Sequence, residues 1–289
     1  MPVYDGGLRF TRMLNRLGDL AAHSRSPLPY GRGSVFPMLV AALFSAGCRP
    51  HTVAQKVAVA AAADLQFALD DVSRGFHQTH PEIEVAVTYG SSGNFYAEIR
   101  NQAPFDVFLS ADIEYPRKLA EEGFADARSM FTYGVGRSVV WAPKQSPLDL
   151  ERLQIHALEA DSVKHIAIAN PQHAPYGRAA EAAMRSLGFY ERVAPKLVLG
   201  ENIAQTLQFV QSGAADVGIV ALALALAPSV RAQGRYWEIP LDAYPKIEQA
   251  GVVLSHAGNI AGAREFCAYL QSGAVRAQLK EYGFYLPEK

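Results

Sequence analysis

The chain is poor in cysteine, with only Cys48 and Cys267 in 289 residues. A secreted domain held together by disulfides needs several paired cysteines, so that class of protein is excluded. Cys267 lies within a helical pattern, where a thiol packs as a small apolar side chain. We therefore predict that Cys267 is a buried core residue and forms no disulfide.

The sequence also lacks an excess of charge of either sign. Its 27 Lys and Arg residues balance 28 Asp and Glu residues, which gives a net charge of −1. No general electrostatic field therefore attracts nucleic acid or an anionic membrane, and we expect neither as a partner. A small anion would have to be captured by a local arrangement of hydrogen-bond donors.

A long hydrophobic run is missing at the N-terminus as well. The apolar segment Val35–Phe44 follows Arg32 and is too short to span a bilayer, but it has signal-peptide length. Ser45-Ala46-Gly47 precedes Cys48 as in a bacterial lipobox, although serine stands where leucine is usual. We predict that residues 1–53 are an N-terminal extension and export segment. The mature protein is then periplasmic, either anchored through a lipidated Cys48 or released by plain cleavage between the small residues.

The residue sets of common catalytic sites are absent too. We find no nucleophile–histidine–acid set, no paired carboxylates in one turn and no metal-ligand spacing. His77 and His80 lie three residues apart at a polar helix end, which favours a solvated surface over a metal site. Gly90-Ser91-Ser92-Gly93 is neither a hydrolase elbow nor a P-loop, because its spacing and its lack of lysine fit neither motif. We predict a protein that is not an enzyme and that needs no cofactor.

From Lys56 onward, short apolar strands alternate with amphipathic helices. The strand-like run Val57–Ala62 leads into Asp64, which is a good N-cap, and the apolar spacing that follows marks one helix face. Phe105–Ser110 and His165–Ala169 are further buried strands followed by helices. This alternation predicts parallel sheets covered by helices on both faces, without internal repeats.

The length after the export segment is enough for two such sheets. We predict an α/β fold with two lobes, in which the chain crosses near Tyr133–Ala142 and returns near Tyr236–Asp242. Residues 56–134 and 241–289 then form lobe 1, and residues 135–240 form lobe 2.

Ligands of such sheets bind beyond the carboxyl ends of the strands, at helix N-termini. Helix N-termini present unpaired N–H groups and a partial positive charge, so they suit anions. The sharpest candidate is Gly90-Ser91-Ser92-Gly93, where glycine allows close approach and serine offers an N–H and a hydroxyl; an ordinary N-cap is the alternative interpretation. Four strand-to-helix turns qualify: Ala63-Asp64, Ser91-Ser92-Gly93-Asn94, Pro175-Tyr176-Gly177 and Glu201-Asn202-Ile203.

With these turns in order, residues 56–286 resemble the periplasmic molybdate-binding proteins of ABC transporters. No single motif is specific, but their order and spacing together are. The segments that carry the resemblance are VAAAADLQFAL (59–69), GSSGN (90–94), APFDVFLSAD (103–112), NPQHAPYG (170–177), PKLVLGENI (195–203), GIV (218–220) and YGF (282–284).

The resemblance implies a type II, flytrap-like periplasmic-binding-protein fold with the ligand between two closing lobes. It implies a dehydrated molybdate held by neutral donors, at Asp64 and Ser92 from one lobe and at the backbone N–H groups of Tyr176 and Ile203 from the other. Such hydrogen bonds are strong because the acceptor is charged. Molybdenum is then present only within molybdate, without direct protein ligands. The implied partner is an ABC permease in the inner membrane, and we expect a monomer.

Two positions depart from the family pattern. Many members have serine where this chain has Asp64, and a carboxylate repels a dianion by roughly 4 kcal/mol per charge pair at contact in a partly wet site. Asp64 could instead cap its own helix and turn its carboxylate away. Some relatives use a tyrosine hydroxyl where this chain has Ala221, and Tyr176 could supply a hydroxyl in its place.

These departures leave the choice of anion open. The leading hypothesis is molybdate, with tungstate as a second ligand, and the same scaffold tuned to sulfate or phosphate is the alternative. A remote alternative is an extracytoplasmic enzyme, for which the sequence lacks the residues. Another is a regulatory effector domain, which would need a DNA-binding segment where residues 1–50 show an export-like run.

Overall fold

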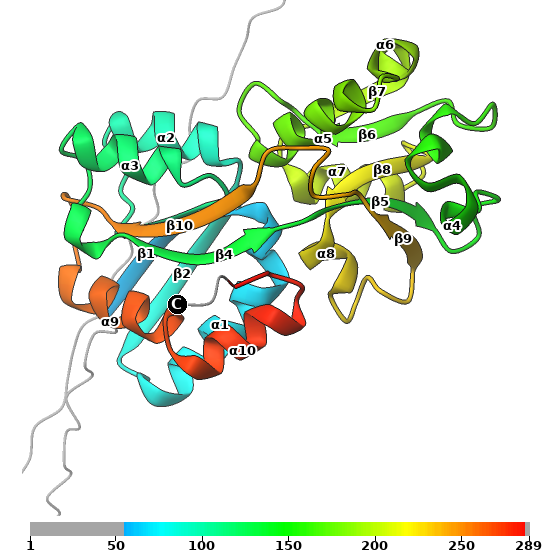
Figure 1. The fold of residues 1–289 in the computed structure, drawn as a ribbon. Coiled ribbons are helices and arrows are strands. Elements are labelled where there is room, and N and C mark those ends of the chain that lie inside the picture. The colour runs from blue at the N-terminus through cyan, green and yellow to red at the C-terminus, as the bar shows by residue number, and fades with distance from the viewer. Residues whose placement is uncertain (1–54, 287–289) are drawn as a thin grey trace, which may run out of the picture. The chain divides into compact units, whose positions relative to one another are not determined.

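The computed structural model describes residues 55–286, so the predicted export segment and Cys48 lie outside the described residues. Figure 1 shows the strands gathered into two sheets, each with helices packed on it. The strands are β1 (Gln55–Ala62), β2 (Ile83–Gly90), β3 (Val107–Ser110), β4 (Phe131–Gly136), β5 (Ser138–Pro143), β6 (Ile166–Ala169), β7 (Leu197–Gly200), β8 (Val217–Ala221), β9 (Gly234–Glu238) and β10 (Ile247–Val253).

The helices fall between these strands, as the sequence alternation predicts. The α-helices are α1 (Gln66–Thr79), α2 (Ser92–Arg100), α3 (Glu114–Glu121), α4 (Leu150–Leu153), α5 (Pro175–Ser186), α6 (Tyr190–Val193), α7 (Ile203–Gln211), α8 (Leu222–Leu226), α9 (Ile260–Leu270) and α10 (Gly273–Glu281). The 3-10 helices are η1 (Ala63–Leu65), η2 (Ala127–Ser129), η3 (Gln154–Glu159) and η4 (Ala194–Lys196). Within residues 55–286, no helix combines the length and the apolar character needed to cross a bilayer.

The sheet of lobe 1 has the strand order β2-β1-β3-β10-β4. Strands β1, β2 and β3 are parallel, and Val59 pairs with Val87 on one side and with Val107 on the other. Helices α2 and α3 cover one face, whereas α1, α9 and α10 lie on the other (Figure 1). The carboxyl ends of β1, β2 and β3 therefore meet at one edge, where Ala63, Ser91 and Ala111 follow them.

The sheet of lobe 2 has the order β7-β6-β8-β5-β9. Strands β6, β7 and β8 are parallel, and helices α5 and α7 pack against them. Short loops connect the carboxyl ends of β6 and β7 to these helices, so that the helix N-termini lie at one edge of this sheet.

The prediction of purely parallel sheets is wrong. Strand β10 runs antiparallel to β3 and β4, and β5 runs antiparallel to β8 and β9. Only Arg137 separates β4 from β5, and residues 239–246 return the chain from β9 to β10. Because these strands arrive from the other lobe rather than through a crossover helix, no local rule makes them parallel to their neighbours.

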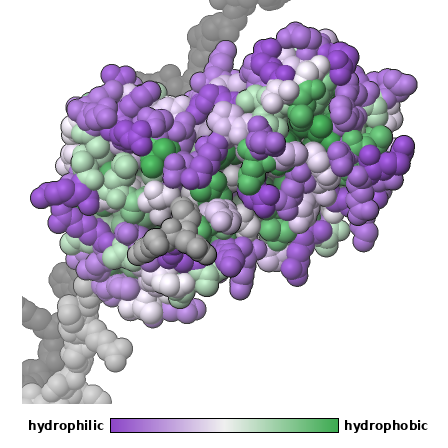
Figure 2. Space-filling model, viewed as in Figure 1, coloured by the Kyte–Doolittle hydropathy of each residue, from purple (hydrophilic) through white to green (hydrophobic). Residues whose placement is uncertain are grey.

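A hydrophobic cluster runs through both lobes, and Trp141 and Phe76 are among its largest fully buried side chains. A smaller cluster, including Phe95 and Phe108, lies under α2 and α3. Cys267 is buried and free, which confirms the prediction from its helical pattern. On the face shown in Figure 2, hydrophobic residues form small areas between hydrophilic ones.

Candidate functional site

All four residues singled out in the sequence line one pocket between the lobes. Asp64 and Ser92 reach it from lobe 1, and Tyr176 and Ile203 reach it from lobe 2. Its volume of about 10 Å³ is roughly what one water molecule needs. A tetrahedral oxyanion is larger, so its entry requires the lobes to separate or the Tyr176 side chain to move.

Asp64 lies in the 3-10 turn η1, directly after β1, and the predicted N-cap role is wrong. The N-caps of η1 and α1 are Ala62 and Leu65, and neither makes a side-chain cap bond. Asp64 is inside the turn rather than before it, so its carboxylate points across the lobe interface. Its Oδ2 accepts hydrogen bonds from the Tyr176 hydroxyl at 2.9 Å and from Gln249 Nε2 at 2.6 Å.

The Asp64 carboxyl is almost fully buried, with 1% of the residue exposed. Burial raises its pKa to about 6, although the hydrogen bonds from Gln249 and Tyr176 act in the opposite direction. Its second oxygen, Oδ1, is buried without a hydrogen-bond partner among the described residues. No arginine, lysine or histidine lines the pocket, so the carboxyl is not neutralised by a cation there.

Ser92 is the first residue of α2, whereas the sequence pattern predicts that the helix begins at Asn94, the last residue of the candidate turn. Ser91 is the N-cap, and its hydroxyl accepts the Asn94 N–H. Ser92 is fully buried, and its Oγ accepts the N–H of Ala111 at 3.0 Å. Because that bond uses only a lone pair, the hydroxyl hydrogen is free to be donated into the pocket. The Ser92 hydroxyl is thus a positioned neutral donor.

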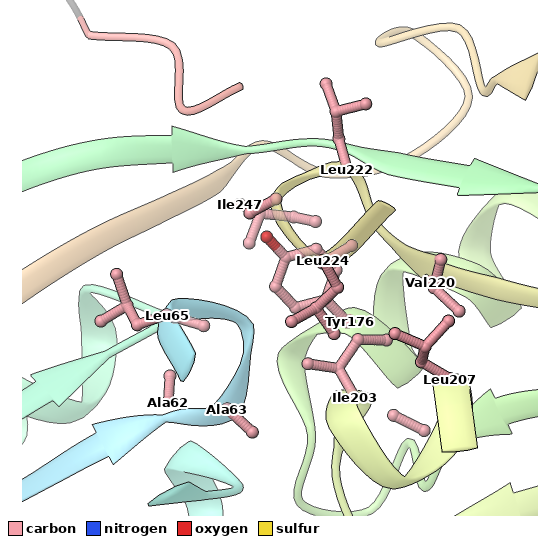
Figure 3. Packing of buried hydrophobic residues seen from close by; sticks show 14 of the residues in the cluster. Ala62, Ala63, Leu65, Tyr176, Ile203, Leu207, Val220, Leu222, Leu224 and Ile247 are labelled. Carbon is pink, nitrogen blue, oxygen red and sulfur yellow. The ribbon is translucent and has the colours of Figure 1, made fainter. Parts of the chain in front are cut away.

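The lobe 2 donors come from the first turns of α5 and α7, where backbone N–H groups have no intrahelical partner. Pro175 begins α5 and directs Tyr176 into the interface, and Asn202 caps α7 by accepting the N–H groups of Ala204 and Gln205. The cap leaves the Ile203 N–H at the tip of the helix. Figure 3 shows the Tyr176 ring between Ile203 and Leu207 on one side and Ala63 and Leu65 on the other.

The Tyr176 hydroxyl has a role that the family pattern did not specify. It bonds Asp64 and reaches Gly136 so closely that a Cβ at that glycine would lie 2.1 Å from the hydroxyl oxygen. Gly136 is the last residue of β4, and its lack of a side chain leaves room for the Tyr176 side chain of the other lobe. Ala221 ends β8 and adds no side-chain donor, as its sequence position predicts.

Gln249 is the residue that sequence reasoning missed. It is fully buried in β10 at a register shift of the ladder, and its Nε2 also lies 3.2 Å from the Tyr176 hydroxyl. Its Oε1 has no partner among the described residues. The available signal was one amide in the otherwise apolar run Gln249–Leu254, but an isolated polar residue does not indicate which residue it contacts.

Direct contacts join the lobes around the pocket. The Gly93 N–H donates to the His173 carbonyl at 2.9 Å, and Ser91 Oγ lies 2.9 Å from His173 Nδ1. Asn94 bonds Glu201 across the same interface. These contacts hold the first turn of α2 against the loop that precedes α5.

An ion pair also joins the two lobes. Arg178 on α5 donates to Asp112 at 2.6 Å and to the Tyr115 hydroxyl at 3.2 Å, both in lobe 1. Its guanidinium also lies over the Tyr115 ring. Because Arg178 and Asp112 side chains are 40% and 25% exposed, water and salt screen this pair.

We predict that Arg178→Met weakens binding of the site's anion by less than about fivefold, since exposed ion pairs contribute roughly 0–1 kcal/mol. The loss should shrink as salt is added, and calorimetric titration at two salt concentrations measures it. Arg185→Met on the same helix is the control, because Arg185 pairs with Glu181 and Glu191 within lobe 2. A loss of a hundredfold would instead mean that Arg178 contacts the anion.

The predicted surface role of the histidine pair fits the structure. His77 is exposed, and His80 stacks on Phe76 with ring centroids 4.2 Å apart. Among residues 55–286, no three His, Cys, Asp or Glu side chains gather as a metal site would require.

The chain is similar to proteins of one family over nearly all of its described residues. The family model for bacterial extracellular solute-binding proteins matches residues 57–285. The molybdate-binding protein ModA of Azotobacter vinelandii is 37% identical over 233 residues, covering 81% of this chain and 91% of that protein. ModA of Rhodobacter capsulatus is 38% identical over 200 residues, covering 69% and 77%.

A solved structure agrees with the sequence relatives. The A. vinelandii periplasmic molybdate-binding protein matches with a TM-score of 0.74 and 33% identity, covering 80% of this chain and 100% of that one. The two-lobed α/β fold predicted from the sequence is thereby confirmed. The chain belongs to the bacterial extracellular solute-binding protein family.

Proposed function

We propose that this protein captures molybdate outside the cytoplasm and delivers it to the permease of an ABC importer. Support comes from the ModA relatives at 37% and 38% identity and from the structural match at a TM-score of 0.74. Tungstate, which has the same charge and shape, is expected to bind as well. We further propose that the protein acts as a monomer in the periplasm and that Cys48 is its lipid attachment site.

One observation carries this proposal: hydrogen-bond donors from two lobes converge on a pocket that no cationic side chain lines. Ser92 offers a hydroxyl hydrogen, and Tyr176 and Ile203 offer N–H groups of two helix first turns. An oxyanion with four oxygens can accept all of these bonds at once, and each is strengthened by the anion's charge. Because donors come from both lobes, binding the anion favours the closed arrangement.

The decisive measurement is calorimetric titration of the purified protein with molybdate, tungstate, sulfate and phosphate. We expect saturable binding of one molybdate per chain at micromolar concentration or below, and weaker binding of the smaller sulfate. The melting temperature should rise with molybdate, since ligand at a hundred times Kd adds about 2.7 kcal/mol of stability. Absence of molybdate binding at micromolar concentrations would defeat the proposal, and preference for sulfate would reassign the ligand.

A further inference from the structure

The ionised carboxyl of Asp64 would repel a doubly negative ligand in this pocket. The residue is 1% exposed and lines the pocket together with Ser92, Tyr176 and Ile203. Oδ2 already accepts two hydrogen bonds, from Tyr176 and Gln249. Oδ1 is buried without a partner among the described residues. An ionised carboxylate there would face the anion with an unbonded oxygen and a like charge.

We propose that the site binds its oxyanion together with one proton, held on Oδ1 of Asp64. This inference rests on the proposed function. The proton comes from solvent when the ligand is a bare dianion such as molybdate, and no bond within the anion changes. The neutral carboxyl then donates from Oδ1 to an anion oxygen, while Oδ2 keeps its bonds from Tyr176 and Gln249.

The groups that face Asp64 supply no positive charge to replace this proton. Tyr176 from α5 and Tyr133 from β4 are buried phenols, and burial raises the pKa of each above its usual value, so both stay neutral. Helices α7 and α8, which pack against the Asp64 turn, contain no titratable residue. Gln249 from β10 is an amide.

The remaining charged groups nearby are engaged elsewhere. On α1 and β2, Tyr89 donates to Asp70, and Asp71 pairs with Arg74. At the rim, His173 contacts Ser91 and lies 3.9 Å from Glu201. Protonation of Asp64 therefore removes the repulsion between its carboxylate and the anion and allows the carboxyl to donate a hydrogen bond to the anion instead.

The pKa of Asp64 suits the uptake of a proton when the anion binds. Burial raises its pKa to about 6, so at neutral pH most molecules are ionised but protonation is accessible. A bound dianion disfavours the ionised form and raises the pKa further. Below about pH 6 the carboxyl already carries its proton, and binding takes up none. Above that value, binding takes up one proton, and affinity falls about tenfold for each pH unit.

The test counts protons directly. Molybdate is titrated calorimetrically into the full chain about one and about two pH units above the pKa of about 6, in two buffers with different ionisation enthalpies. The dependence of the observed heat on the buffer enthalpy gives the number of protons taken up. We expect about one proton per molybdate at the higher pH, with affinity falling about tenfold between the two pH values.

Variants assign that proton to Asp64. Asp64→Asn keeps the size and supplies an N–H donor without titrating, so it should bind molybdate with no proton uptake and with affinity independent of pH. Asp64→Ser, with the residue common in relatives, is the second variant if the first does not fold. Asp71→Asn is the control, since Asp71 pairs with Arg74 and accepts the Tyr282 hydroxyl away from the pocket. It should retain the wild-type proton uptake.

The outcomes separate this inference from the proposed function. Molybdate binding by the wild type without proton uptake overturns the inference and leaves the proposed function standing. Proton uptake that persists in the Asp64 variants also overturns it. If neither the wild type nor Asp64→Asn binds molybdate at any pH, both fail. Proton uptake in the wild type that is lost in each Asp64 variant that folds supports it.

Discussion

Gly93→Ala should weaken molybdate binding by about 5- to 150-fold while leaving the fold intact. A Cβ at Gly93 would lie 2.6 Å from the His173 carbonyl oxygen and 2.8 Å from its Cα. Both are backbone atoms of the opposite lobe, so they cannot rotate away as a side chain would. Overpacking of this kind costs typically 1–3 kcal/mol, which corresponds to that loss of affinity.

The cost should appear in binding rather than in folding. The clash exists only while the first turn of α2 meets the loop before α5, and the site needs that approach because its donors come from both lobes. Calorimetric affinity and the melting temperature without ligand measure the two effects separately. Gly273→Ala is the matched control, since nothing lies within 4 Å of the added carbon at the start of α10. Wild-type affinity in Gly93→Ala would show that this contact plays no part in capture.

Ser92→Ala should weaken molybdate binding by about 10- to 150-fold. The Ser92 hydroxyl is buried at the pocket, and its oxygen already accepts the Ala111 N–H, which leaves its hydrogen for an anion oxygen. A hydrogen bond to a charged acceptor contributes about 1.5–3 kcal/mol, and alanine removes it. The same change leaves the buried Ala111 N–H without its acceptor, which costs about 1–3 kcal/mol of stability.

A second serine separates these two effects. Ser272→Ala removes the N-cap of α10, where Ser272 Oγ accepts the Val275 N–H. Ser272 belongs to lobe 1, as Ser92 does, but it is far in sequence from the residues of the pocket. The substitution should lower the free energy of unfolding by about 1 kcal/mol and leave affinity unchanged. Thermal unfolding and titration of both variants make the comparison. Equal affinity of Ser92→Ala and wild type would remove Ser92 from the binding site.

Local sequence was sufficient for much of the fold. The apolar runs that became β1 and β3 are short-range signals, and they predicted these strands closely. The turn after β2 was predicted as well, but α2 begins at Ser92 rather than at Asn94, because Ser91 takes the N-cap position. Such signals work because strand period, helix spacing and capping depend on neighbouring residues.

The meeting of the candidate turns also followed from the sequence. Parallel strands bring their carboxyl ends to one edge, so turns far apart in sequence were expected to meet there, and Asp64, Ser92, Tyr176 and Ile203 do line one pocket. The direction of the strands that link the lobes did not follow. Strands β5 and β10 come from the other lobe, and their pairing depends on how whole sheets assemble.

The sequence by itself determined the elements, the alternation that builds two α/β lobes and the helix starts that can present donors to an anion. Only the tertiary structure decided what Asp64 does: its carboxyl bonds Tyr176, 112 positions away, and Gln249, 185 positions away. A local pattern allowed Asp64 to cap its own helix equally well. The choice was made by burial at an interface, where a carboxyl must find donors among residues that no local pattern relates to it.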